Sequence, residues 1–345
     1  MYKKYLAALL LLGYAEFLSA QGVKQLWIST AGGKFAKGAV ISLDGVGNNL
    51  TTRYDFKTID KTSFVEFQDG KYYGISEYGI FEWNSTANTY ERKTPGSPPF
   101  YKYFNSGLEP LGDLSFYNGK FYGILGGNMG YIFEWDPATN TFTTKIDFTQ
   151  TDAAHPWANL TMVNGKFYGF YAGISLGGIF EWDPSTNVFT IKKEVDFQGI
   201  PLNFDKVLLT NYQQKFYGID YWGGSIYEWD PLTNDVTIKY TLTEAEGKFA
   251  VGKFAILNGK FYGLTKEGGQ YGKGVLFEWD PSTNIYQVKH NFVGVTGENP
   301  VEGLTLINNK LYGAAFLGGS NNLGVLFEWD PATGVYTVKK KFGWN

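Results

Sequence analysis

The chain has 345 residues, of which 43% are hydrophobic, 18% are aromatic and 44 are glycine, and it has no cysteine and only two histidines. This apolar fraction is too high for a disordered chain, and the lack of cysteine excludes disulfides, thiolate metal sites and cysteine nucleophiles. The formal net charge of −3 provides no basic surface for nucleic acid and no polybasic patch for a membrane.

Residues 1–20 have the features of a secretory signal peptide. Lys3 and Lys4 precede an apolar run from Leu6 to Leu12, and the small residues before Gln21 resemble a cleavage site. A membrane-spanning helix needs about 20 apolar residues, whereas this run is shorter and is followed by Glu16. We therefore expect residues 21–345 to form one domain that is secreted or held at the cell surface, without membrane insertion.

The rest of the chain is a tandem repeat. The phrase Phe-Glu-Trp, once written Tyr-Glu-Trp, recurs at intervals of 47 to 52 residues, with its glutamates at Glu82, Glu134, Glu181, Glu228, Glu278 and Glu328. A degenerate further copy surrounds Val40–Leu43. Repeats of this length indicate a propeller or a solenoid. We divide the chain into seven units, residues 22–56, 62–93, 111–148, 157–197, 204–242, 250–292 and 301–342.

Each unit predicts four short antiparallel strands. An apolar first strand ends at a two-residue turn such as Asn258-Gly259, which suits a type I′ hairpin. The second strand, Lys-Phe-Tyr-Gly, leads into a glycine-rich loop, and the third carries Phe-Glu-Trp and stops at Asp-Pro-x-Thr-Asn, as at residues 136–140. The fourth is rich in lysine, as in Tyr336–Lys340, which is typical of an edge strand protected from aggregation.

These units predict an all-β fold, a seven-bladed β-propeller of four-stranded antiparallel blades. A four-stranded sheet with two apolar faces must bury both against neighbours, and radial packing does so while leaving only short edges. The first unit begins at its second strand, Leu26-Trp27, so we expect blade one to have three strands. A six-bladed ring with the N-terminal strands appended is the alternative.

The order of these elements resembles that of kelch-type propeller units. Leu311-Tyr312-Gly313, followed by Gly318-Gly319, Gly324–Phe327 and Asp330-Pro331, is still more similar to the GloVer tandem repeats of exported bacterial proteins. The resemblance covers residues 22–342 and implies a secreted or surface propeller, but no particular activity. Two units depart from the pattern: Asp44-Gly45 replaces Asp-Pro, and Glu77–Gly79 lacks the double glycine.

The repetition distinguishes residues that are needed for folding from residues that could form a functional site. A residue present in every unit serves folding, so we expect each repeated glutamate to satisfy donors within its own blade, whereas functional groups should be unique. Non-repeated residues gather in the loops between strands two and three and in the inter-blade connections, which leave a blade on the same side. Aromatic rings beside amides suit the binding of a glycan or a protein. The candidate ligand-binding residues are Trp157, Trp222, Tyr221, Tyr271, Tyr101, Tyr103, His155, Asn321 and Asn322.

Other interpretations stay open. Trp157 and Trp222 could instead plug the mouth of the ring, and the protein could be a structural component of a surface appendage. A hydrolase or lyase acting on polysaccharides would use channel carboxylates, for which the candidates are Asp113, Asp205, Glu298 and Glu302. His155 lacks a nucleophile motif nearby, and His290 on a fourth strand is expected to be inert. We expect no cofactor; calcium is the one ion left open, although the chain has no Asp-x-Asp-x-Asp-Gly loop.

Overall fold

The computed structural model describes residues 10–12, 26–30, 39–43, 50–55, 62–68, 71–76, 79–84, 87, 89–93, 109–126, 130–148, 156–172, 176–196, 209–221 and 224–342. Side chains are described from Lys71 onward, except at some strand residues such as 109–113 and 157–159.

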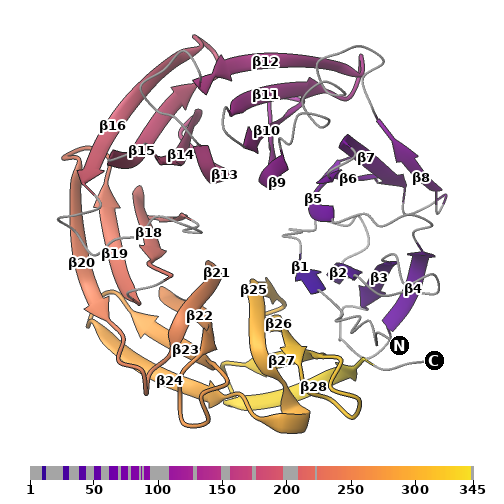
Figure 1. Ribbon diagram of the computed structural model, residues 1–345, viewed down its shortest axis with the longest axis vertical. Helices are drawn as coiled ribbons and strands as arrows, with labels where there is room; N and C mark the ends of the chain where they lie inside the picture. The colour runs from indigo at the N-terminus through magenta and orange to yellow at the C-terminus, as the bar shows by residue number, and fades with distance from the viewer. Residues whose placement is uncertain are drawn as a thin grey trace, which may run out of the picture. The chain divides into compact units, whose positions relative to one another are not determined.

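The chain is an all-β propeller built from four-stranded antiparallel blades, and six of these are complete sheets made wholly of repeat units (Figure 1). The first two of these blades consist of β5 (Thr62–Gln68), β6 (Lys71–Ser76), β7 (Gly79–Asn84) and β8 (Thr89–Arg92), and of β9 (Glu109–Tyr117), β10 (Lys120–Gly126), β11 (Tyr131–Asp136) and β12 (Thr141–Asp147). The next two consist of β13 (Pro156–Val163), β14 (Lys166–Ala172), β15 (Leu176–Asp183) and β16 (Val188–Asp196), and of β17 (Thr210–Tyr212), β18 (Lys215–Ile219), β19 (Ser225–Asp230) and β20 (Asp235–Thr241). The last two consist of β21 (Lys248–Leu257), β22 (Lys260–Glu267), β23 (Val275–Asp280) and β24 (Ile285–Asn291), and of β25 (Glu298–Ile307), β26 (Lys310–Leu317), β27 (Val325–Asp330) and β28 (Val335–Lys341).

The first repeat unit differs from these six. It supplies three strands, β2 (Leu26–Thr30), β3 (Ala39–Leu43) and β4 (Leu50–Asp55), and the fourth strand of its sheet is β1 (Leu10–Leu12). The expectation of seven blades is therefore corrected to six complete blades, and the expectation that the first unit has three strands of its own is confirmed. The reason is in the sequence, because unit 22–56 has no segment ahead of β2 equivalent to the first strands of the others.

Contacts divide the chain into two compact units, residues 1–62, 85–89 and 240–345 in one and residues 63–84 and 90–239 in the other. Besides strands there is a short 3-10 helix, η2 (Gly294–Thr296). In the part of the chain that the structure describes, no helix has the length and apolar character needed to cross a membrane.

The predicted turns are confirmed. Both residues of the Asn258-Gly259 turn have positive φ, 52° and 77°, as a type I′ hairpin requires. In the Asp-Pro turn after β11, Asp136 Oδ1 accepts the backbone N–H of Ala138 at 2.9 Å and of Thr139 at 3.3 Å. The aspartate thus ends the third strand by capping the turn.

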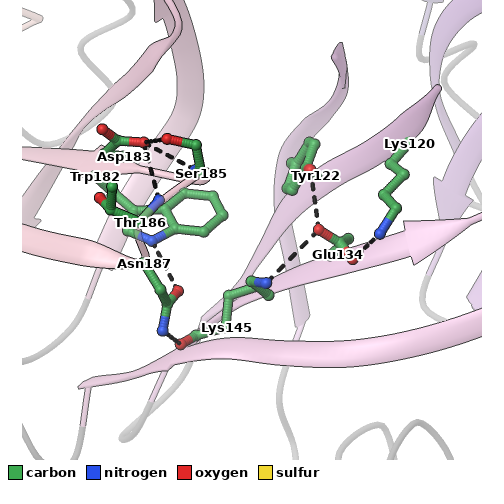
Figure 2. A network of polar contacts seen from close by, with 9 residues as sticks. All are labelled: Lys120, Tyr122, Glu134, Lys145, Trp182, Asp183, Ser185, Thr186 and Asn187. Atoms are coloured by element: carbon green, nitrogen blue, oxygen red, sulfur yellow. Dashed lines mark hydrogen bonds and ion pairs between the residues drawn. The ribbon is translucent and has the colours of Figure 1, made fainter. Parts of the chain in front are cut away.

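Each repeated glutamate is bound within its own blade, as expected. In blade β9–β12, Glu134 accepts hydrogen bonds from Lys120 Nζ at 2.6 Å and Tyr122 Oη at 2.9 Å, and Lys145 Nζ lies 3.7 Å away (Figure 2). Burial would raise the pKa of Glu134, but the hydrogen bonds from Lys120 and Tyr122 outweigh it, so the pKa lies below its usual value. The pKa values of Glu181, Glu228, Glu278 and Glu328 are lowered in the same way.

The lysine from the fourth strand that reaches this carboxylate lies at a β-bulge, two residues beyond the partner of the glutamate in the sheet. Ile132 pairs with Ile146 and Phe133 with Thr144, so Lys145 is an extra residue between two pairs. Lys192, Lys289 and Lys339 occupy the same bulged position in their blades. These lysines are therefore partners of the core glutamate, and guarding an exposed edge is not their only role.

Neighbouring blades are joined through the same tyrosine. The Tyr122 ring lies 4.9 Å from that of Phe167 and 5.6 Å from that of Trp182 in the next blade, centroid to centroid. Tyr73 and Tyr168 contact the following blades in the same manner. These aromatic rings therefore lie between neighbouring blades.

A polar contact accompanies this packing. Trp182 Nε1 donates to Asn187 Oδ1 at 3.1 Å, and Asn187 Nδ2 donates to the carbonyl of Lys145 in the preceding blade at 3.3 Å (Figure 2). The same Trp–Asn bond recurs at Trp135, Trp229 and Trp279. In the last blade Gly334 stands at the asparagine position, and the buried Trp329 Nε1 has no hydrogen-bond partner.

We expect Gly334→Asn to stabilise the protein by about 1 kcal/mol, because it supplies the missing acceptor for Trp329. Gly334 has φ 68°, close to the 57° of Asn284, and a Cβ there would meet only the Trp329 ring, at 3.9 Å. Urea unfolding of the wild type and of the Gly334→Asn variant measures the difference in stability. Gly334→Ala is the control and should destabilise, since it keeps the strained φ without the amide. Equal stability of the Asn and Ala variants would contradict the assignment.

The glutamate cluster gives a second prediction. Tyr312→Phe removes a 2.7 Å hydrogen bond to Glu328 while leaving the ring in place, so it should lower the free energy of unfolding by about 1.5 to 3 kcal/mol. The matched control is Thr337→Ser, because exposed Thr337 pairs with Glu328 in the sheet without joining the cluster. Denaturant unfolding at neutral pH measures both. A Tyr312→Phe protein as stable as the control would show that the bond contributes nothing.

His290 gives a prediction about pH. Its ring stacks on Tyr336 at 3.8 Å, its Nε2 is buried without a partner, and burial lowers its pKa to about 4. The unfolded chain then binds a proton more tightly than the folded one, so stability should fall as the pH drops from about 6.5 towards 4. His290→Phe keeps the stacking on Tyr336 and should remove this dependence of stability on pH. Thermal unfolding between pH 7 and 5 tests it, and parallel curves for the two proteins would refute it.

Candidate functional site on the loop face

Loops from both expected sources meet on one side of the blades β21–β24 and β25–β28. The backbone N–H of Gly269, in the loop between β22 and β23, donates to the carbonyl of Glu244 in the connection before β21 at 2.9 Å. This loop also meets the start of β25, where Asn299 N donates to the Lys273 carbonyl at 2.9 Å. We call this side of the two blades the loop face.

The connection from β24 to β25 is rigidly held. Thr296 Oγ1 donates to the Val293 carbonyl at 2.7 Å, and Tyr336 Oη donates to the Thr296 carbonyl at 2.7 Å. Glu298 accepts the N–H of Gly294 at 3.1 Å and pairs with Lys273 at 3.0 Å. The loop therefore presents its exposed side chains at little entropic cost on binding.

The preceding connection, from β20 to β21, has the same scaffold with other residues at its tip. Tyr286 Oη donates to the Glu246 carbonyl at 2.7 Å, as Tyr336 does to Thr296. This correspondence aligns Thr243 and Ala245 with Val293 and Val295. The tip residues thus differ between two loops whose support is the same.

Three large apolar side chains are exposed on the linked loops. Tyr271 is 49% exposed, Val293 41% and Val295 59%. We call these three residues the loop-face patch. Tyr271 was predicted from the sequence, whereas the two valines were missed; aligning residues 243–245 with 293–295 is the comparison that would have found them.

The other described candidates have mixed roles. Asn321 is exposed, while Asn322 has φ 55° and accepts the N–H of Gly318 at 2.9 Å, so it shapes its own loop. Tyr221 is half-buried in a turn. Glu298 is engaged by Lys273 and Gly294, and Glu302 lies in β25 with φ 58°.

The side chains of the remaining candidates lie outside the described part of the chain. Asp113 lies in β9 and Trp157 in β13, and the side chains of both are outside the described part. Tyr101, Tyr103, His155, Asp205 and Trp222 lie outside the described residues altogether. Among the side chains that are described, no group of three or more histidines, aspartates and glutamates is placed to hold a metal ion.

The solved structures that share this fold include two enzymes and the extracellular domain of a two-component system. A puromycin-hydrolysing peptidase from Mycobacterium tuberculosis matches with a TM-score of 0.65 at 12% identity, over 97% of this chain and 54% of that one. This chain thus spans about half the length of the peptidase. An oligogalacturonate lyase in complex with manganese matches with a TM-score of 0.62 at 10% identity, over 93% and 90% of the two chains. At such identities the likeness shows the fold alone.

A third structure is the extracellular domain of a putative hybrid two-component system from B. thetaiotaomicron. It matches with a TM-score of 0.62 at 14% identity, over 92% of this chain and 38% of that one. No curated protein matches the sequence. Residues 177–345, which include the last three complete blades, match the model of the Gloeobacter/Verrucomicrobia repeat.

Proposed function

We propose that this protein is a ligand-binding module that acts through its loop face on a protein or a glycan. The observation that carries the proposal is the loop-face patch. Tyr271, Val293 and Val295 are exposed at non-repeated positions, on loops that hydrogen bonds and an ion pair hold in place. Exposed apolar groups on a preorganised surface are characteristic of binding sites.

The charges of the repeats support binding over catalysis. The five repeated glutamates with lowered pKa values are bound by lysine and tyrosine of their own blades; they are Glu134, Glu181, Glu228, Glu278 and Glu328. A general acid needs a raised pKa, so these carboxyls are unsuited to donate a proton at neutral pH. They serve the scaffold, and the loops are left to carry function.

We further propose that residues 1–20 are removed during export. The basic and apolar pattern of residues 3–12 supports export.

The patch predicts a loss of binding on substitution. Val293→Thr with Val295→Ala introduces the residues that the preceding connection tolerates at these positions, and Tyr271→Ser removes the ring. The triple variant should keep its melting temperature and lose binding by about tenfold or more, as expected when apolar anchors are removed. Binding is measured on arrays of glycans and of extracellular proteins.

Ile285→Ser with Val335→Ser is the matched control, because both residues are equally exposed but begin fourth strands, after the Asp-Pro turns. Binding that survives the triple variant, or that the control removes, would refute the assignment. Release of soluble sugar from a polysaccharide by the wild-type protein would favour the hydrolase or lyase alternative.

A further inference from the structure

The first sheet contains a strand that its own repeat unit does not supply. β1 pairs antiparallel with β2, with Leu10 opposite Thr30, Leu11 opposite Ser29 and Leu12 opposite Ile28. β1 lies within residues 1–20, which we propose are removed. The processed chain would then have an unpaired edge on β2.

The place that β1 occupies is also bordered by the last blade. Within its compact unit, β1 also contacts β25 and β26 of the last blade. β26 has the sequence Lys-Leu-Tyr-Gly-Ala-Ala-Phe-Leu, with Ala314 and Ala315 fully buried. A strand in this place therefore gains backbone hydrogen bonds from β2 and apolar contact beside the last blade.

The residues that remain ahead of β2 are too few to refill the place. Only Gln21–Gln25 would remain ahead of β2. If Lys24 and Gln25 form the shortest hairpin turn, residues 21–23 pair with Leu26–Ile28 and reach no further. Ser29 and Thr30, which β1 covers, would stay unpaired.

We propose that the edge of β2 is an acceptor site for a short, uncharged, aliphatic β-strand of a different polypeptide, bound antiparallel to β2. This rests on the proposed removal of residues 1–20. An unpaired strand edge is a template for strand addition, in which backbone bonds provide affinity and side-chain contacts provide selectivity. Leu10–Leu12 shows the kind of strand that fits. The strands described from β5 to β28 are all paired within their own sheets, so a second copy offers no spare strand from this part of the chain.

The test uses the exported protein, after mass spectrometry shows that it begins at Gln21. The probe is a peptide of residues 7–13, Ala-Ala-Leu-Leu-Leu-Leu-Gly, with two lysines added at each end. The melting temperature of the protein should rise with peptide concentration, and hydrogen exchange of its Ser29 and Thr30 amides should slow. A peptide with Leu11→Pro should bind about tenfold more weakly or worse, because proline removes a ladder hydrogen bond.

Several results would overturn the proposal: no change in melting temperature, equal binding of the two peptides, protection confined to other strands, or a secreted chain that keeps residues 1–20. The loop-face triple variant separates this site from the proposed function. It should bind the peptide as the wild type does, whatever its effect on the array ligands.

The uncut chain provides a second, independent test. Expressed without export, it should be destabilised by Leu11→Pro and unaffected by Leu11→Val, because only proline interrupts the pairing of β1 with β2. Melting temperatures measure both variants. Equal melting temperatures would show that no strand occupies this edge, which overturns the acceptor site.

Discussion

The architecture depends on one buried or partly buried carboxylate in each of the blades from β9 to β28, held between a tyrosine hydroxyl and two lysines. In blade β25–β28, Glu328 is 5% exposed and receives Tyr312, Lys310 and Lys339 within 3.6 Å or less. A buried charge is tolerated only when it is paired and hydrogen-bonded. The equivalent tyrosine of blade β9–β12 also packs against the next blade, so one side chain joins the polar interior of its blade to the apolar joint between blades.

The repeated features could be predicted because each rests on local chemistry. Asn258-Gly259 specifies its hairpin and Asp136 its turn without reference to the rest of the fold. The lysine partners could not be predicted. Lys289 reaches Glu278 because it lies two residues beyond Gln287, the residue that pairs with Glu278, and this register between the two strands is known only from the sheet. The origin of β1 was likewise unpredictable, because a leader and an edge strand share an apolar composition.

The candidate site could be predicted only in outline. Grouping the loops by topology identified the face and Tyr271, since both rest on strand order. Val293 and Val295 escaped notice because isolated valines in a loop are common and carry no motif. Their significance depends on the alignment of two connections, which the contacts of Tyr286 and Tyr336 establish.

The contacts that join neighbouring blades have a consequence for how such a chain evolves. The unit of β13–β16 carries both halves of the joint. Tyr168 contacts the blade that follows, and Phe167, Trp182 and Asn187 contact the blade that precedes. Duplication of the gene segment for one unit therefore creates a new interface that is already complementary. The repeat can be gained or lost by recombination without any compensating mutation at the seam.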